Sequence, residues 1–333
     1  MKALILSAAD RPLEIRDVEI PALSEPDAVL VRLEAAALNR RDYYISKGLY
    51  AKIQYPIILG SDGCGIAVAG HSEWLNKEVV INPSFDWGEN IAAQSTRFSI
   101  LGMPRNGTLA EYVAVPADRL RAKPKHLSAV QAAALPLAGV TAYRAVMTQG
   151  GCCAGQTVLI TGIGGGVALF ALQFANAVGA KVFCTSGSNE KLEKAETIGA
   201  IGTANYRNEN WDKQLLEQTG GFDLIIDGAG GEQMNSLLSL CKPGGSVVSY
   251  GATLGAVKNL NLHRIFWKQI RLQGSTMGTD ADFDAMLAFA ERHDIMPTVD
   301  NVYSFDNATD AFARMEQGQQ FGKIVVNISN GKF

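Results

Sequence analysis

One stretch of the sequence decides the fold, residues 158–191, which read VLITGIGGGVALFALQFANAVGAKVFCTSGSNEK. Its first apolar run predicts a strand, and the glycines that follow predict a loop. The apolar residues at 167–179 have helical spacing, and AKVFCTS at 180–186 predicts a second strand. A strand, a glycine-rich loop, a helix and a second strand in this order are the context in which dinucleotide sites are found.

The spacing within the glycine loop also fits a dinucleotide. Gly162 permits a tight turn, Gly165 lets the backbone approach a pyrophosphate, and Ala168 lets the helix pack close to the strand. The helix would begin at Gly166 and Val167, where its free N–H groups and positive dipole end meet the phosphates. The spacing is G-x-x-G-x-x-A, one residue longer at the first interval than G-x-G-x-x-G. A glycine-rich turn without a ligand is the alternative, and the flanking elements favour the site.

The end of the second predicted strand indicates which dinucleotide binds. NAD sites usually carry Asp or Glu there, about 20 residues after the glycines, to bond the ribose 2′-hydroxyl. This chain carries Ser186, Gly187 and Ser188 instead. Hydroxyls and a nearby cation suit a 2′-phosphate, and Lys191 in the next predicted helix is the candidate cation. We therefore expect NADPH to be the cofactor. The alternative for Lys191 is an ordinary exposed lysine on a helix.

Strands and helices alternate between residues 126 and 264, which predicts a doubly wound parallel sheet. Apolar strand-like runs recur at 157–162, 180–186, 222–230 and 244–253. Residues 1–125 are instead rich in short strand-like runs interrupted by glycine and proline. The expected fold class is therefore α/β, with a β-rich domain and a Rossmann cofactor domain.

Composition excludes several other classes of protein. The 333-residue chain is 47% hydrophobic and has a net charge of −3, without a cluster of Lys and Arg, so neither nucleic acid nor an anionic membrane is an expected partner. It shows no signal peptide and no apolar run of about 20 residues. The five cysteines lack CxxC spacing, which indicates reduced thiols in a cytoplasm. No His/Cys cluster indicates a metal site.

A series of blocks in register resembles the medium-chain dehydrogenase/reductases, in particular their quinone-reductase-like members. These blocks are NRRDYYISKGLY (39–50), YPIILGSDGCGIAVAG (55–70), GTLAEYVAVPADRL (107–120), AAALPLAGVTAYRA (132–145), VLITGIGGGVA (158–168) and GKIVVNI (322–328). The resemblance implies a GroES-like catalytic domain at 1–125, to which residues 265–333 return, and a Rossmann domain at 126–264. It also implies a homodimer.

The zinc sites of that family are replaced in this chain. At the positions that match the catalytic zinc ligands it carries Asn39, Ser61 and Leu137, none of which is a good zinc ligand. The stretch 83–113, which matches the structural-zinc lobe, has no cysteine. The resemblance therefore implies a member that lacks both metal sites.

Without zinc, another group must stabilise negative charge that develops on a substrate oxygen. Reduction of a quinone or an α,β-unsaturated carbonyl is then easier than alcohol oxidation, because the charge is delocalised. We expect an NADPH-dependent oxidoreductase that transfers hydride to such a small-molecule electrophile. One alternative is an alcohol dehydrogenase or ketone reductase that uses a protein acid in place of zinc. Another is a cofactor-binding sensor or structural protein without turnover.

Asn39 and Tyr44 are the candidate catalytic residues, as hydrogen-bond donors in the pocket. Asn39 occupies a metal-ligand position, and Tyr44 is either a proton donor or an aromatic wall. We expect Asp42 to hold its loop by hydrogen bonds, and Arg40 and Arg41 to form a solvated edge.

Further cofactor contacts are expected from outside the glycine loop. Gly251 and Thr253 follow a predicted strand at its carboxyl end, where ligands bind in open α/β sheets. The resemblance implies that Thr141, Ser275 and Met277 line the nicotinamide end. It also implies that Tyr206 stacks near the phosphate of the adenosine ribose.

Overall fold

The computed structural model describes residues 1–9 and 11–329 of the chain. The chain forms two compact units, the first made of Met1–Ala138 with Thr279–Phe333 and the second of Gly139–Gly278. The boundaries expected from sequence, after residues 125 and 264, lie earlier in the chain than these. No helix among the described residues is long and apolar enough to cross a membrane.

The first unit is built on antiparallel β-structure. Its main sheet has the strand order β10-β6-β5-β3-β18-β17, with β9 also paired to β3. The bounds of these strands are β3 (Ala28–Ala37), β5 (Asp62–Gly70), β6 (Glu78–Ile81), β9 (Tyr112–Pro116), β10 (Leu120–Ala122), β17 (Val299–Ser304) and β18 (Lys323–Asn327). A three-stranded sheet and a two-stranded ribbon complete the unit, with β1 (Lys2–Leu6), β2 (Glu14–Asp17), β4 (Ile57–Ile58), β7 (Ser84–Phe85) and β8 (Ser99–Ile100).

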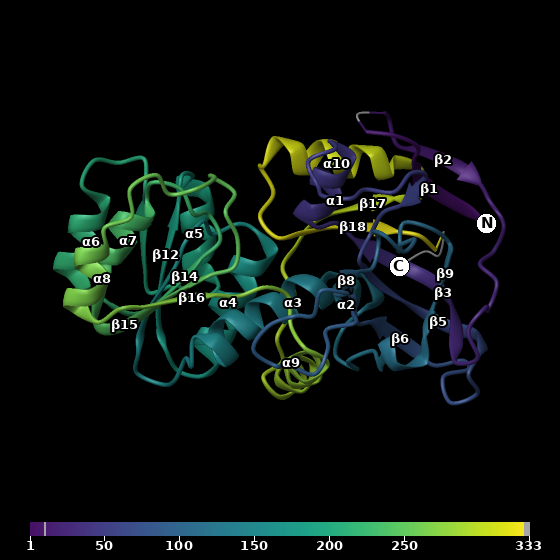
Figure 1. The fold of residues 1–333 in the computed structure, drawn as a ribbon, viewed down its shortest axis with the longest axis horizontal. Coiled ribbons are helices and arrows are strands. Elements are labelled where there is room, and N and C mark those ends of the chain that lie inside the picture. The colour runs from purple at the N-terminus through teal and green to yellow at the C-terminus, as the bar shows by residue number, and fades with distance from the viewer. Residues whose placement is uncertain (10, 330–333) are drawn as a thin grey trace. The chain divides into compact units, whose positions relative to one another are not determined.

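The end of the chain completes this sheet. Strand β18 runs antiparallel to β3, with Val325 opposite Ala37, and parallel to β17. The helices of this unit are α1 (Arg40–Ser46), α2 (Ala129–Ala134), α9 (Asp280–Arg292) and α10 (Ala308–Gln317) (Figure 1). Where the chain returns, the Asp280 carboxylate binds the Arg119 guanidinium at 2.6 Å and accepts a hydrogen bond from Asn82. The tail is therefore fastened to the first unit from the start of α9 onward.

Helix α2 explains why the first unit extends beyond residue 125. Its Ser128 cap accepts the N–H of Gln131, and the helix packs against β3, β5 and β18 with Ala132, Ala133 and Ala134 buried. The change to an Ala-rich helical pattern therefore occurs within the first unit. Helix α3 (Pro136–Tyr143) then carries the chain across the boundary.

The second unit is a doubly wound parallel sheet, as the sequence predicts. Its strand order is β13-β12-β11-β14-β15-β16, and every neighbouring pair is parallel. Helices α4 and α5 lie on one face, and α6, α7 and α8 on the other (Figure 1). The strands are β11 (Thr157–Ile160), β12 (Lys181–Ser186), β13 (Gly202–Asn205), β14 (Phe222–Asp227), β15 (Cys241–Ser249) and β16 (Arg271–Gly274). The helices are α4 (Gly166–Ala177), α5 (Asn189–Thr197), α6 (Trp211–Thr219), α7 (Met234–Leu240) and α8 (Leu262–Lys268), with a π-helical turn at Arg144–Gln149.

Two late elements explain why this unit extends beyond residue 264. Strand β16 is short and partly charged, with the sequence RLQG, and α8 buries none of its residues. Neither element shows the alternation or helical period by which buried elements are found in a sequence. The strand order nevertheless brings the carboxyl ends of β11, β12 and β14 to one edge, where ligands bind in such sheets.

Candidate functional site

The glycine loop after β11 has the geometry of a phosphate cradle. Gly162 has a φ of +65°, and the N–H of Ile163 donates to the Thr185 carbonyl at 2.8 Å, which ties the loop to β12. A Cβ atom added to Gly162 or Gly165 would meet no atom within 4 Å. Helix α4 starts at Gly166, so its first N–H groups have no partner within the helix. The loop therefore has open space beside backbone donors, which fits a dinucleotide pyrophosphate.

Two serines lie where the second strand ends. Ser186 is buried, and its hydroxyl accepts the N–H of Ser188 at 3.3 Å. The Ser188 hydroxyl caps α5 by accepting the N–H of Lys191 at 3.4 Å. Both hydroxyls act as acceptors here, so each keeps its proton for a ligand. The nearby acid, Glu190, is paired with Lys194 on the exposed side of α5 at 2.6 Å.

Lys191 and Tyr206 approach this region from two directions. A Cβ atom added to Gly164 would lie 2.8 Å from Cδ and 3.3 Å from Nζ of Lys191, so this side chain lies over Gly164. The Tyr206 N–H donates to the Ser186 carbonyl at 3.1 Å, and its hydroxyl lies 2.9 Å from a Cβ position on Gly187. The structure thus brings both expected residues to the ends of β11 and β12.

Gly251 and Thr253 lie in the loop after β15 and contact the loop after β14. The Thr253 hydroxyl donates to the Gly228 carbonyl at 3.0 Å, and a Cβ atom on Gly251 would lie 2.8 Å from the same oxygen. Asp227, at the end of β14, accepts a hydrogen bond from the Thr161 hydroxyl at 2.5 Å. The loops at the carboxyl edge of the sheet are therefore joined to one another.

Thr141 and Met277 are in contact in the second unit, and Ser275 lies beside the end of β15. The Thr141 hydroxyl donates to Sδ of Met277 at 3.8 Å, and the Ser275 N–H donates to the Ser249 carbonyl at the end of β15. The Ser275 hydroxyl is buried and has no hydrogen-bond partner among the described residues. A buried hydroxyl without a partner is costly, which fits a polar ligand group at this place.

The first unit contains a buried polar cluster where three neighbouring strands meet. Strand β3 is antiparallel to both β5 and β18, so its carboxyl end lies beside their first residues. Asn39 follows β3, Asp62 begins β5 and Lys323 begins β18. All three side chains are buried. The topology therefore places an amide, a carboxylate and an ammonium together.

Each polar group in this cluster has a specific partner. Lys323 Nζ donates to Asn39 Oδ1 at 2.6 Å and to Asp62 Oδ2 at 2.9 Å. Asn39 Nδ2 donates to the same Asp62 oxygen at 2.9 Å, and the Leu137 N–H donates to the other Asp62 oxygen at 2.8 Å. The amide of Asn39 is thereby held in one orientation between the ammonium and the carboxylate.

Arg41 corrects one expectation. Arg40 is exposed as expected, but Arg41 is buried, and its Nη1 donates to the Ser61 hydroxyl at 2.7 Å and to the Leu101 carbonyl at 2.8 Å. The expectation of a solvated edge was wrong for Arg41 because residues 40–46 form a helix, α1, that turns this side chain inward.

Asp42 holds the start of α1, as expected. Its carboxylate accepts the N–H of Asn39 at 2.8 Å and the N–H of Gly60 at 3.1 Å. Burial raises the pKa of Asp42, while the neighbouring Arg41 charge and these two bonds lower it by a smaller amount. Asp42 therefore positions Asn39 through the backbone.

Tyr44 lies on α1 and is half-buried. Its ring packs at a tilt of 54° against Tyr43, with centroids 5.8 Å apart. Within the described part of the chain its hydroxyl makes no hydrogen bond, so its proton is available. This geometry suits a proton donor and an aromatic wall equally, and the assignment of Tyr44 stays a prediction.

The residues at the expected metal positions do not fit zinc. Asn39 and Ser61 are bonded to Lys323 and Arg41, and Leu137 contributes its backbone N–H to Asp62. Among residues 1–9 and 11–329, no group of three or more His, Cys, Asp or Glu side chains lies close enough to hold a metal ion. Cations of the chain itself therefore lie against the side chains at two of these positions.

Sequence reasoning missed Lys323 and its pairing with Asp62. A single lysine before the apolar run IVVNI was the available signal, because a buried lysine needs a paired acid. The partner of Lys323 could not be read from spacing, since Asp62 lies 261 residues away.

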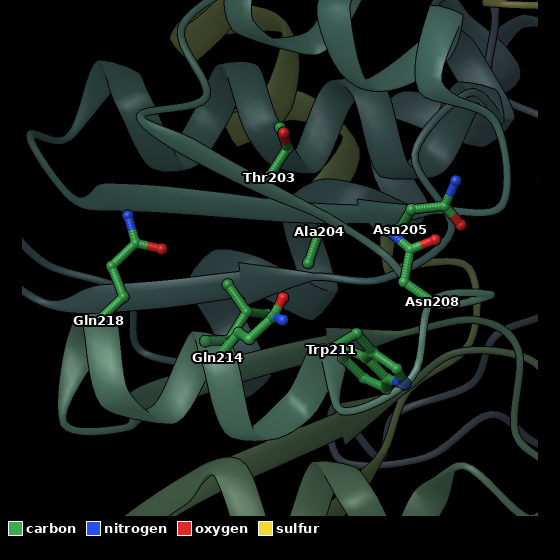
Figure 2. A pocket seen from close by; sticks show the side chains of 8 residues that line it. Thr203, Ala204, Asn205, Asn208, Trp211, Gln214 and Gln218 are labelled. Carbon is green, nitrogen blue, oxygen red and sulfur yellow. The ribbon is translucent and has the colours of Figure 1, made fainter.

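A pocket of about 160 Å³ lies elsewhere in the second unit, between β13 and α6 (Figure 2). Its lining is mostly polar and consists of Thr203, Ala204, Asn205, Asn208, Trp211, Gln214, Leu215 and Gln218. None of the predicted site residues is among them. The pocket borders the turn at 205–208, which also contains Tyr206.

Comparisons with known proteins agree with this architecture. The family model of the alcohol dehydrogenase GroES-like domain matches residues 25–125, and that of the zinc-binding dehydrogenases matches residues 166–292. The zinc-type alcohol dehydrogenase-like protein YogA of Leptosphaeria maculans is 35% identical over 95% of both chains. A 2-methylene-furan-3-one reductase of Solanum lycopersicum is 30% identical over 93% of this chain and 74% of its own length.

A solved structure extends the match to three dimensions. The crystal structure of an NAD-dependent alcohol dehydrogenase has a TM-score of 0.92 and 34% identity, over 99% of this chain and 100% of that chain. Both domains are thus matched in order, by relatives that span nearly the whole sequence. The chain therefore belongs to the medium-chain dehydrogenase/reductase superfamily, as an alcohol dehydrogenase-like oxidoreductase.

Proposed function

We propose that the protein is a zinc-independent, NADPH-dependent oxidoreductase that transfers hydride to a quinone or an α,β-unsaturated carbonyl. The observation that carries this proposal is the buried Lys323–Asn39–Asp62 cluster. By the resemblance described above, Asn39 in this cluster matches a position that ligates catalytic zinc in other members of the family. A protein built in this way must stabilise charge on a substrate oxygen with its own donors.

Two features support NADPH as the cofactor. The glycine loop has open space beside free N–H groups, and β12 ends in Ser186 and Ser188 without an acid to repel a 2′-phosphate. When bound, NADPH supplies the hydride. The chain supplies backbone donors, two hydroxyls and the Lys191 ammonium to hold it.

The proposed chemistry assigns a distinct task to each buried group. Asn39 Nδ2 carries two protons and donates one to Asp62, so one remains for a substrate oxygen. Lys323 binds Asn39 Oδ1 and prevents the amide from turning over. The Tyr44 hydroxyl supplies a proton. Quinones and enones spread the developing charge over several atoms, so donors of this strength suffice.

A ketone reductase or alcohol dehydrogenase without zinc is the second candidate. The names of YogA and of the solved NAD-dependent enzyme favour it. The Solanum lycopersicum relative is named as a 2-methylene-furan-3-one reductase, which favours reduction of an α,β-unsaturated carbonyl. The Asn39 amide supports the enone proposal, because alcohol oxidation involves full negative charge on one oxygen and Asn39 offers one neutral donor.

We also propose that two copies of the chain associate through β16. This strand ends the parallel sheet, so its outer backbone groups have no partner in the sheet order. On α8, the helix that precedes this strand in the chain, Trp267 is 81% exposed and Phe266 is 59% exposed. An open sheet edge and exposed aromatic side chains are typical of an interface, and a two-fold axis would continue the sheet into a second copy.

The substrate class is tested by a panel of quinones, enones, simple ketones and alcohols on wild type and Tyr44→Phe. We expect turnover of quinones or enones with NADPH. Tyr44→Phe should lower kcat about 10²–10⁴-fold, because it removes a general acid, and leave NADPH affinity unchanged. Tyr43→Phe is the matched control, since the Tyr43 hydroxyl binds the exposed Glu316. Preferred turnover of simple alcohols would favour the second candidate, and NADPH binding without any turnover would favour a sensor.

The position of Lys323 is tested with Lys323→Met and the double variant Asp62→Asn/Lys323→Met. The single change leaves a buried carboxylate without its cation and should lower the free energy of unfolding by about 3–5 kcal/mol. The double variant removes both charges and should recover most of this stability. Lys242→Met is the control, because its partly exposed pair with Asp223 should contribute about 1 kcal/mol or less.

Kinetics of the double variant separate positioning from charge balance. We expect kcat to stay reduced by about tenfold or more with KM nearly unchanged, because the Asn39 amide is no longer held. A double variant with wild-type kcat would show that Lys323 serves stability alone.

The dimer is tested by sedimentation or light scattering. Wild type should have a mass near twice the 35.6 kDa of one chain, and Trp267→Lys should shift it toward the monomer. A wild-type monomer at micromolar concentration, or an unchanged Trp267→Lys dimer, would contradict the proposed interface.

A further inference from the structure

The turn after β13 presents an arginine to the end of β12. A Cβ atom added to Gly187 would lie 2.8 Å from Arg207 Nε and 2.9 Å from the Tyr206 hydroxyl. These two side chains therefore lie directly over Gly187, in the position where NAD sites carry their acid. A larger residue at Gly187 would displace them, so the glycine and the arginine belong to one arrangement.

The turn that carries Arg207 is held on both sides. Asn205 Oδ1 accepts the Arg207 N–H at 3.0 Å, and Asn205 Nδ2 donates to Asn189 on α5 at 2.6 Å. The Asn208 N–H closes the turn on the Asn205 carbonyl, and the Tyr206 N–H binds the Ser186 carbonyl. Figure 2 shows Asn205 and Asn208 together at one end of the amide-lined pocket. The backbone at Arg207 is thus fixed relative to β12 and α5.

The charge of Arg207 is not used within the chain. In the part of the chain that the structure describes, its guanidinium makes no hydrogen bond or ion pair. The acid in the first turn of α5, Glu190, is paired with Lys194. Lys191 lies over Gly164, on the glycine-loop side of the same region. A cation, a phenol and two serine hydroxyls therefore surround the end of β12.

We propose that Arg207 is a specificity-determining residue that binds the 2′-phosphate of NADPH, together with the Tyr206 hydroxyl. The inference rests on the proposed NADPH function and names the residue that gives the preference. A planar guanidinium donates two parallel hydrogen bonds to phosphate oxygens, whereas a 2′-hydroxyl offers no charge to bind. Arg207 thus distinguishes the two cofactors, and backbone donors of the glycine loop bind the pyrophosphate that both share.

The test measures dissociation constants of NADPH and NADH for wild type, Arg207→Met, Arg207→Lys and the control Lys213→Ala. We expect wild type to favour NADPH by about tenfold or more, as one charge-assisted bond implies. Arg207→Met should weaken NADPH about tenfold or more and change NADH less than twofold. Arg207→Lys should retain part of the preference, and the exposed helix residue Lys213 should have no effect. 2′,5′-ADP should compete with NADPH more strongly than 5′-AMP does. The difference between these two competitors should fall among the variants in the same order as the NADPH preference.

Two further results separate this inference from the proposed function. If wild type prefers NADPH and Arg207→Met leaves that preference intact, or weakens both cofactors equally, Arg207 does not bind the 2′-phosphate while the NADPH function stands. If wild type binds NADH as well as NADPH, both are overturned. Ser186→Asp tests the cofactor preference itself, because it restores a carboxylate that repels the 2′-phosphate and can pair with Arg207, and it should reduce or reverse the preference.

Discussion

The ion pair between Lys323 and Asp62 is the constraint on which the polar cluster of the first unit depends. Both side chains are buried, and a buried charge is tolerated when it is paired and hydrogen-bonded. The pair joins β18 to β5 across β3, so it links the last strand of the chain to the strands of its first third. Asn39 binds both charged groups, and these hydrogen bonds fix the orientation of its amide. Its amide is therefore oriented by hydrogen bonds to residues of two other strands.

The two units divide the chemistry in a way that follows from their topology. Antiparallel neighbours bring Asn39, Asp62 and Lys323 together because a strand's end meets its neighbour's start. Parallel strands bring Gly162, Ser186 and other cofactor candidates together because all carboxyl ends share one edge. The loop after β13 adds Tyr206 and Arg207 to that edge. In each unit, strand direction therefore determines which residues lie together. We expect their side chains to determine which ligand binds.

The sequence pattern predicted the elements with strong periodicity and missed those held by polar partners. The glycine loop, β12 and α4 were found because apolar spacing and glycines encode them locally, and the doubly wound sheet is confirmed. Residues 40–46 were expected to form a loop but form helix α1. The start of this helix is capped by the Asp42 carboxylate, which apolar periodicity does not reveal. Lys323 was missed because its partner Asn39 is 284 residues away. Burial of Arg41 likewise depends on carbonyls at Leu101 and Met103, which no local pattern reveals.

The central proposal is that Lys323 and Arg41 take the place of zinc, because they bind Asn39 and Ser61, which the resemblance matches to zinc-ligand positions. The most direct measurement is the metal content of protein expressed and purified with zinc present, by elemental analysis before and after a chelator wash. The account predicts far less than one zinc ion per chain, and turnover of quinones or enones that the chelator does not change. One zinc ion per chain, retained through the wash and lost in Asn39→Ala, would contradict it.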